Sequence, residues 1–238
     1  MTLRLNVWSG PRNVSTALMR SWENREDTVV VDEPFYAAYL ARTGIDHPGR
    51  DSVVASQPTD PVDVVAGLLA PLPDGADVQY AKQMSHHVLP GDDLGWSRAF
   101  RNVLLVRDPA EVVASYVRSR EACEPDDLGL LQQLRLLEVW DEVPPVIDAA
   151  DFLRDPEAHL RWLCDWLGLG FTDRMLAWPP GPRPSDGVWA PHWYDAVWRS
   201  TGFEPYRPRE VSLSPHDAAV AVACRPAYEE LHALRVLP

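Results

Sequence analysis

Short β-branched or apolar runs alternate along this chain with stretches of helical periodicity, and this alternation limits the folds that the chain can adopt. Such alternation is typical of a parallel sheet with helices on its faces. The predicted strands cover Leu3 to Trp8, Thr28 to Val31, Val78 to Met84, Asn102 to Val106 and Pro145 to Ile147. The predicted helices cover Ser15 to Arg25, Pro109 to Glu121, Leu128 to Glu138, Pro156 to Leu167 and Pro215 to Leu234. We therefore predict an α/β fold.

The length of the chain, 238 residues, suits one α/β domain with a sizeable core. Its 23 prolines concentrate in short connections, which we interpret as ordered loops of limited freedom. The proline-rich stretch Trp178 to Gly187 lies too close to the carboxyl end to separate two domains. We expect a single domain over residues 1–238, with a helical cap that begins at about residue 185.

Charge and cysteine content exclude several classes of function. The 35 acidic and 22 basic residues leave a formal net charge of −13, which opposes binding to nucleic acid or to an anionic membrane. The three cysteines are widely separated and form no metal-binding or disulfide pattern, and we expect no bound metal. The chain shows no basic and apolar leader and no membrane-spanning apolar run, so we expect a cytoplasmic protein. The sequence does not indicate an oligomeric state.

The first candidate site is the turn after the first predicted strand, between Leu5 and Met19. Ser15 or Asn13 could cap the helix that follows, and the first N–H groups of that helix would then point at an anion. Arg12 adds a fixed positive charge with several donors. The segment therefore predicts a phosphate-binding turn, although it differs from the common G-x-x-x-x-G-K-[ST] sequence and the same residue types are frequent in structural turns.

The second candidate site follows the fourth predicted strand. Arg107 ends this apolar strand, which would deliver its guanidinium to the carboxyl edge of the sheet, where open α/β folds bind ligands. Ser115 follows about two turns into the next helix. The structural alternatives are an Arg107–Asp108 ion pair at a helix start and an ordinary packing role for Ser115.

The segment Pro11 to Thr16 resembles the 5′-phosphosulfate loop of sulfotransferases, and the run with Arg107 and Ser115 resembles their 3′-phosphate motif. A third stretch, Val146 to Leu169, resembles a strand and helix of the family whose role is structural. The resemblance implies a three-layer P-loop NTPase-like fold with a central, mainly parallel sheet flanked by helices. It also implies sulfuryl transfer from 3′-phosphoadenosine 5′-phosphosulfate (PAPS), without a metal, to a hydroxyl or amine of a small-molecule acceptor.

The same resemblance assigns roles residue by residue. Arg12 would contact the bridging and sulfuryl oxygens, and Arg107 with Ser115 would hold the 3′-phosphate. The 5′-phosphate would be bound by the rest of the turn, in which Val14 stands at a glycine position of the family: Asn13, Val14, Ser15 and Thr16.

The resemblance leaves two candidates for the base that removes the acceptor proton. Glu33, just past the second predicted strand, stands where tyrosylprotein and related sulfotransferases have a catalytic Glu. In cytosolic sulfotransferases a K-T-H sequence supplies a His base and a Lys near the leaving group, and here Lys82 with His86 or His87 could correspond. A His near its ordinary pKa could act as a base without tuning. The structural alternatives are a helix-start carboxylate and solvated loop histidines.

Aromatic residues cluster after the proline-rich loop, from Trp189 to Trp198. Helical spacing would place Trp189, Trp193 and Val197 on one face, either as a cap on the core or as a lid over the ligand. A late basic residue, Arg183 or Arg199, could complete the 3′-phosphate site.

Two other functions compete with sulfuryl transfer. A P-loop phosphotransferase acting on a small molecule would account for the first turn but would leave Arg107 and Ser115 without a role. A degenerate nucleotide-binding or interaction protein without catalysis is the second alternative, and it is supported by Val14 at a glycine position and by the longer spacing from Lys82 to His86.

Overall fold

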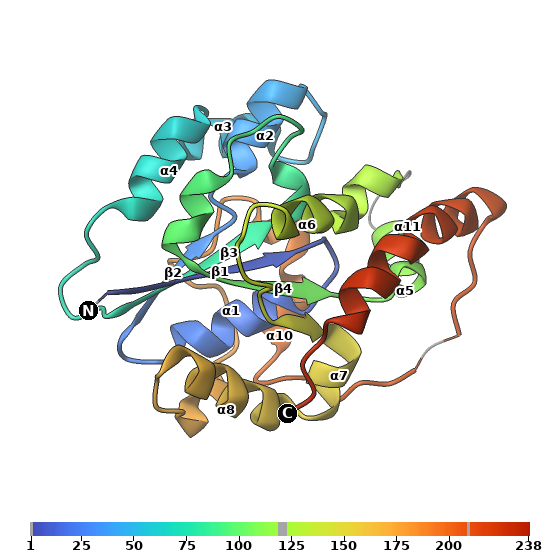
Figure 1. The fold of residues 1–238 in the computed structure, drawn as a ribbon. Helices are drawn as coiled ribbons and strands as arrows, with labels where there is room; N and C mark the ends of the chain where they lie inside the picture. Colours follow the sequence, from blue (N-terminus) through green and yellow to red (C-terminus); the bar gives the residue numbers. More distant parts are fainter. Residues whose placement is uncertain (1, 119–122, 209) are drawn as a thin grey trace.

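The computed structural model describes residues 2–118, 123–208 and 210–238. Within these residues, five strands form one sheet in the order β2-β3-β1-β4-β5, and every neighbouring pair is parallel (Figure 1). The strands are β1 (Leu3–Ser9), β2 (Thr28–Asp32), β3 (Val78–Met84), β4 (Arg101–Val106) and β5 (Val146–Asp148). The predicted strands therefore lie within one residue of the observed ones at each end, and the predicted α/β class is confirmed.

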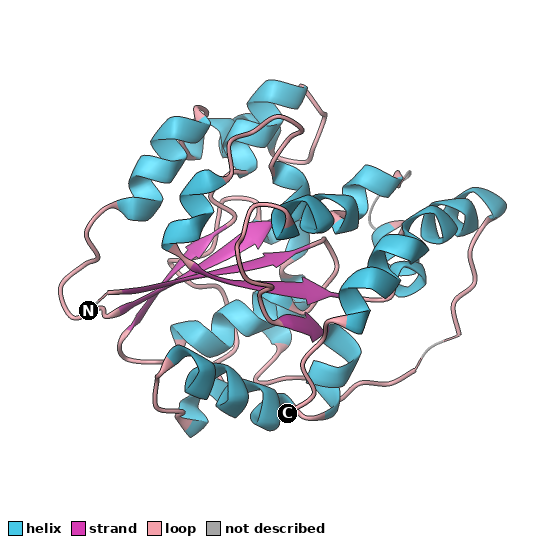
Figure 2. Cartoon of the chain, viewed as in Figure 1, coloured by secondary structure: helices cyan, strands magenta, loops and turns pink. Residues whose placement is uncertain are grey.

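Helices cover both faces of the sheet (Figure 2). The described α-helices are α1 (Ser15–Glu23), α2 (Tyr36–Thr43), α3 (Arg50–Ser56), α4 (Pro61–Leu69), α5 (Pro109–Tyr116), α6 (Leu130–Leu137), α7 (Ala149–Arg154), α8 (Pro156–Leu167), α9 (Ala190–Trp193), α10 (Asp195–Arg199) and α11 (Pro215–Ala233). Short 3-10 turns form η1 (Ser85–His87), η2 (Gly95–Ala99), η3 (Pro125–Leu128) and η4 (Asp173–Leu176). None of the helices in the described ranges is long and apolar enough to cross a membrane.

Local sequence signals account for the helices that were predicted. An aspartate precedes the first-turn proline of both α5 and α8, and the side chain of each aspartate accepts a hydrogen bond from a backbone N–H of the helix. The predicted bounds of α8 match the structure, whereas α1 ends two residues before the predicted Arg25. The predicted extension of α5 to Glu121 enters residues 119–122, which lie outside the described residues.

Sequence reasoning missed α2, α3 and α4, the helices between β2 and β3. The helix α3 spans seven residues and buries only Val53, and α4 buries only Val64 and Leu68. Such short helices carry too few apolar positions to show a periodic pattern.

The core has two main parts because successive strand residues point to opposite faces of the sheet. Leu5 and Val7 of β1 pack on the face covered by α1 and α8 (Figure 1). Trp8 lies on the other face with residues of α5, α6 and α11. Strand β4 divides in the same way, with Val103 and Leu105 on the first face and Leu104 and Val106 on the second.

The chain after residue 185 does not form the single helix that the Trp189–Trp193–Val197 spacing suggested. Two short helices, α9 and α10, meet at Tyr194, which ends one and precedes the other. The break allows the Tyr194 hydroxyl to reach the buried carboxylate of Asp32 at 2.7 Å. Helix α11 then packs beside α5, as Figure 1 shows.

Candidate active site

A cavity of about 280 Å³ opens at the carboxyl ends of β1, β2, β3 and β4. Parallel strands bring their carboxyl ends to one edge of a sheet, which is where α/β folds bind ligands. Eleven of the residues that the sequence suggested for the site line this cavity: Arg12, Asn13, Val14, Ser15, Thr16, Glu33, Lys82, His86, His87, Arg107 and Ser115. The structure thus brings together side chains that are up to 103 positions apart in the sequence, as in the Arg12–Ser115 contact.

The turn after β1 has a constrained backbone. A Cβ atom at Gly10 would lie 2.0 Å from the Leu128 carbonyl oxygen, so only glycine fits there. Arg12 adopts a left-handed conformation with φ of 55°, which is uncommon for a residue with a side chain. The Asn13 amide donates to the Leu105 carbonyl at 3.1 Å, and its side-chain oxygen accepts from the Val14 N–H at 3.0 Å. These contacts fix the turn at the edge of the cavity.

The expectation that Ser15 or Asn13 caps α1 is wrong. Ser15 is the first residue of the helix, Val14 occupies the capping position, and no side chain caps the helix. The side chain of Asn13 is instead committed to the turn itself. First-turn N–H groups at the cavity wall are therefore free of side-chain caps, and an uncapped helix start is suited to binding an anion.

Positive charge is concentrated beside this helix start. The Arg12 Nε donates to the Ser115 hydroxyl at 3.1 Å, and Arg107 Nη1 donates to the Arg12 carbonyl oxygen at 2.8 Å. Burial and the nearby charges of Arg118 and Arg107 lower the pKa of Arg12. Both of these described neighbouring charges are positive. An anion bound here would relieve this repulsion.

Arg107 does not form the ion pair with Asp108 that was considered as its structural alternative. Its guanidinium pairs with Glu111 at 2.9 Å, one turn further along α5. Asp108 pairs with Arg225 at 2.8 Å and accepts a hydrogen bond from the Ala110 N–H at the start of α5. The Arg107 guanidinium therefore lies at the cavity wall, against the backbone of Arg12 in the turn before α1.

At the ends of β2 and β3, one ammonium group and two carboxylates form a buried cluster. The Lys82 Nζ lies 2.6 Å from Glu33 Oε1, 3.0 Å from Asp32 Oδ1 and 2.5 Å from the Tyr194 hydroxyl. Sequence reasoning found Glu33 and Lys82 but missed Asp32 and Tyr194. One signal in the sequence pointed to this cluster: Lys82 is the only lysine in the chain, which otherwise uses arginine. A single lysine beside two acidic residues at strand ends suggests an ion pair there.

The cluster has a clear electrostatic bias. Burial raises the pKa of Glu33, and the adjacent Asp32 charge adds to this increase, while the Lys82 charge opposes it. Burial acts to lower the pKa of Lys82, but the two carboxylates outweigh it and the pKa is raised. Lys82 therefore stays an ammonium ion, while Glu33 is a stronger base than an ordinary glutamate. Its left-handed backbone, with φ of 42°, is an uncommon conformation of the kind found at functional sites.

The two histidines are not in the state that the sequence argument assumed. Burial and the neighbouring His47 lower the pKa of His86 to about 3, and burial also lowers the pKa of His87. The His87 ring stacks on Tyr36 with ring centres 4.7 Å apart and on Tyr39 at 4.9 Å. Both histidines line the cavity as neutral rings, so neither is the base of ordinary pKa that the sequence suggested.

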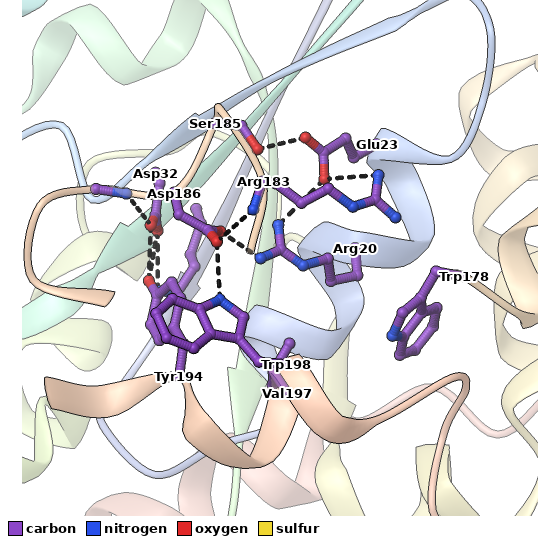
Figure 3. A network of polar contacts seen from close by, with 12 residues as sticks. Arg20, Glu23, Asp32, Trp178, Arg183, Ser185, Asp186, Tyr194, Val197 and Trp198 are labelled. Atoms are coloured by element: carbon purple, nitrogen blue, oxygen red, sulfur yellow. Dashed lines mark hydrogen bonds and ion pairs between the residues drawn. The ribbon is translucent and has the colours of Figure 1, made fainter. Parts of the chain in front are cut away.

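The segment 183–198 is attached to the sheet by polar contacts (Figure 3). Asp186 pairs with the buried Arg20 of α1 and accepts from the Trp198 indole at 2.9 Å. The backbone N–H of Gly187 donates to Asp32 at 3.3 Å. These contacts hold α9 and α10 over the cavity, where Trp193 and Val197 contribute to its wall.

Neither late arginine contributes to the cavity wall. Arg183 pairs with Glu23 at 3.4 Å, and Arg199 pairs with Asp195 on its own helix. Neither is among the described residues that line the cavity. The suggested role of Arg183 or Arg199 in a 3′-phosphate site is therefore not supported by their positions.

One group of described residues, Asp148, Asp151 and His232, has the spacing of possible metal ligands. Tyr228 donates to Asp148 at 3.0 Å, while Arg235 donates to Asp151 at 2.9 Å and lies 3.3 Å from His232 Nδ1. The group does not line the cavity. We interpret it as a hydrogen-bonded network that joins α7 to α11.

The parallel sheet and the uncapped helix start at its carboxyl edge agree with the resemblance of the sequence to sulfotransferases. Residues 3–233 match the model of the sulfotransferase domain family, and the chain therefore belongs to that family. Among solved structures, the chain is similar to the sulfotransferase domain from the curacin biosynthetic pathway, with a TM-score of 0.57, 16% identity and coverage of 100% of this chain and 99% of that chain. It is also similar to a sulfotransferase from Alicyclobacillus acidocaldarius, with a TM-score of 0.56, 16% identity and coverage of 100% and 98%. These likenesses show the fold.

Two curated relatives come from Arabidopsis thaliana. The chain is 34% identical over 235 residues to branched-chain-amino-acid aminotransferase-like protein 2, covering 95% of this chain and 41% of that protein. It is 37% identical over 221 residues to branched-chain-amino-acid aminotransferase-like protein 1, covering 90% and 39%. The chain thus spans about two fifths of the length of these relatives.

Proposed function

We propose that this chain transfers the sulfuryl group of PAPS to a hydroxyl or amine of a small-molecule acceptor. The observation that carries the proposal is that a single cavity joins the arginine-rich start of α1 to the buried Glu33–Lys82 pair. The first part suits a bisphosphorylated nucleotide and the second suits proton transfer. The net charge of −13 supports a small molecule rather than a nucleic acid as the partner.

The sheet order supports the placement of the donor. Strand β1 carries the turn of Arg12 and lies between β3, which carries Lys82, and β4, which leads to Arg107. We assign the uncapped start of α1 and Arg12 to the 5′-phosphosulfate, and Arg107 with Ser115 to the 3′-phosphate. Arginine offers several donors in a planar fork that matches phosphate oxygens.

The Glu33–Lys82 pair supplies the proton transfer and the charge stabilisation. Glu33 takes the proton of the acceptor hydroxyl or amine as that atom forms its bond to sulfur. The bond between sulfur and the bridging phosphate oxygen breaks, and the leaving phosphate carries the electron pair. Lys82 and Arg12 stabilise the negative charge that develops there. Because Glu33 lies at the cavity wall with a raised pKa, it suits this role better than the weakly basic His86.

The names of the curated relatives suggest aminotransferase activity, which we do not assign to this chain. Pyridoxal phosphate enzymes bind their cofactor through a lysine Schiff base, which requires a neutral amine. The only lysine here, Lys82, is held as an ammonium ion by Asp32 and Glu33. The match also covers only about two fifths of those relatives.

The first test is the activity of Glu33→Gln with PAPS and a panel of hydroxyl and amine acceptors. Loss of a general base is expected to reduce kcat by about 10²–10⁴-fold. Binding of 3′-phosphoadenosine 5′-phosphate, measured by calorimetry, should stay within about threefold, because Gln keeps the size of the side chain. Near wild-type turnover of Glu33→Gln together with a large loss in His86→Gln would move the role of base to His86.

Preferential binding of ATP with magnesium over 3′-phosphoadenosine 5′-phosphate would favour a phosphotransferase instead. If neither nucleotide raised the melting temperature of the protein, a degenerate fold without nucleotide binding would be the better interpretation.

A further inference from the structure

Two buried side chains at the catalytic cluster, Asp32 and Tyr194, have no part in the steps proposed above. Asp32 and Lys82 have side chains that are each 2% exposed, whereas the Glu33 side chain is 11% exposed. Glu33 and Lys82 line the cavity, and Asp32 is not among the described residues that line it. Of the two carboxylates bound to Lys82, one therefore faces the cavity and the other lies behind the ammonium group.

The carboxylate behind Lys82 is surrounded by donors. It receives the Lys82 ammonium at 3.0 Å, the Tyr194 hydroxyl at 2.7 and 2.8 Å, and the Gly187 N–H at 3.3 Å. Such a set of donors is suited to a carboxylate that stays charged. Among its described partners, Glu33 has one close donor, Lys82, and a longer contact of 3.3 Å with the Tyr194 hydroxyl, which lies closer to Asp32, at 2.7 Å.

The Tyr194 hydroxyl is itself held in place. Lys82 lies 2.5 Å from its oxygen, and the Trp189 indole donates to it at 3.2 Å. With both donors on its oxygen, the hydroxyl can direct its own proton only at a carboxylate. Trp189 is fully within the core and Asp186 anchors the same segment to Arg20, so the position of the hydroxyl is set by the C-terminal segment.

We propose that Asp32 and Tyr194 are positioning residues. Asp32 is the permanent counter-ion of Lys82, and Tyr194 orients the Asp32 carboxylate. Glu33 can then exchange a proton while the Lys82 ammonium group keeps a negatively charged partner. This inference rests on the sulfuryl transfer proposed above. Two carboxylates and one ammonium carry one surplus negative charge in a buried site, and that surplus promotes proton uptake. The division of roles follows from position, since only Glu33 of the two faces the cavity.

The other titratable groups around the cluster do not replace Asp32 in this role. The Tyr80 hydroxyl beneath the cluster and the Tyr194 hydroxyl both have a pKa raised by burial, and His87 has a pKa lowered by burial. All three are therefore neutral near pH 7. The groups that face Lys82 or its carboxylates are Asp32, Glu33, Tyr80, His87 and Tyr194.

The single lysine allows a test that needs no acceptor. Protein labelled with [¹⁵N]lysine carries one labelled residue, so the side-chain nitrogen signal reports the titration of Lys82 directly. We expect Asp32→Asn to lower the pKa of Lys82 by about 1–3 units, since a close opposite charge is lost. The matched control is Asp148→Asn, which alters another buried aspartate that accepts a tyrosine hydroxyl. An unchanged Lys82 titration in Asp32→Asn would overturn the proposal.

The second readout is the dependence of kcat on pH. Removal of the Asp32 charge removes the like charge that raises the pKa of Glu33, so the acid limb of the profile should move to lower pH in Asp32→Asn. Tyr194→Phe should move it by a smaller amount in the opposite direction, because the hydrogen bond from the Tyr194 hydroxyl lowers the pKa of Glu33. Its control is Tyr228→Phe, which loses a tyrosine–aspartate hydrogen bond of the same kind away from the cavity.

The two readouts separate the possible outcomes. A purely structural role would lower the melting temperature of Asp32→Asn and Tyr194→Phe to the same extent as the controls and leave the acid limb unmoved, which would overturn the proposal. If the wild-type protein transferred no sulfuryl group, the proposed function would fail, while the lysine titration would still decide whether Asp32 is the counter-ion.

Discussion

Removal of the Arg107 guanidinium tests whether the cavity recognises a 3′-phosphate. The variant is Arg107→Ala, and the two ligands are 3′-phosphoadenosine 5′-phosphate and adenosine 5′-phosphate, which differ by that one group. Arg107 Nη1 also holds the Arg12 carbonyl at 2.8 Å, so some loss of affinity is expected for both ligands. The informative quantity is therefore the ratio of the two dissociation constants in each protein.

The structure sets the expected size of the effect. A hydrogen bond to a charged group contributes about 1.5–3 kcal/mol. The Arg107 side chain is 27% exposed and already paired with Glu111, so solvent and this carboxylate weaken its contact with a ligand. We take the lower part of the range, about 1.5 kcal/mol, which corresponds to roughly a tenfold change in the dissociation constant.

Calorimetric titration of both proteins with both ligands measures this coupling. We expect the wild type to prefer the 3′-phosphorylated ligand by roughly tenfold or more, and Arg107→Ala to lose most of that preference. Arg235→Ala, which removes a partly buried arginine paired with Asp151 away from the cavity, should keep it. Equal losses for both ligands in Arg107→Ala would refute a specific contact with the 3′-phosphate, and equal affinities in the wild type would refute the site.

Two further predictions concern stability. Gly10→Ala should lower the free energy of unfolding in urea by at least about 1–3 kcal/mol, because the new Cβ would lie 2.0 Å from the Leu128 carbonyl oxygen. The control is Gly170→Ala, at a position with open space around it. Equal losses in the two variants would contradict the reasoning. His86 has a pKa of about 3 when folded and about 6.5 when unfolded, so the unfolded state binds more protons between these values and stability falls as pH falls through that range. The urea midpoint should therefore drop less between pH 7 and about pH 4.5 in His86→Gln than in the wild type, and parallel losses would show that His86 is not the cause.

Much of the fold was predictable because its signals are local. Each strand is a short apolar run, and the helices α5 and α8 begin at an aspartate followed by proline, so a few neighbouring residues determine the element. The helices α2, α3 and α4 were missed because none is long enough to show a clear apolar periodicity, although α2 buries five of its eight residues. The two-helix arrangement around Tyr194 was also missed, since it depends on a hydrogen bond to Asp32, 162 positions away.

The sequence by itself indicated the parallel α/β architecture, because the alternation of strands and helices can be recognised without knowledge of distant contacts, and its resemblance to sulfotransferases supplied the candidate base residues. It did not determine which of those residues are charged. Only the tertiary structure partly buries His86 beside His47 and so lowers its pKa to about 3, and only the structure places Asp32 and Tyr194 against Lys82. Burial and charge pairing depend on residues brought together by folding, and these two effects decide the protonation states on which the chemistry of the cavity depends.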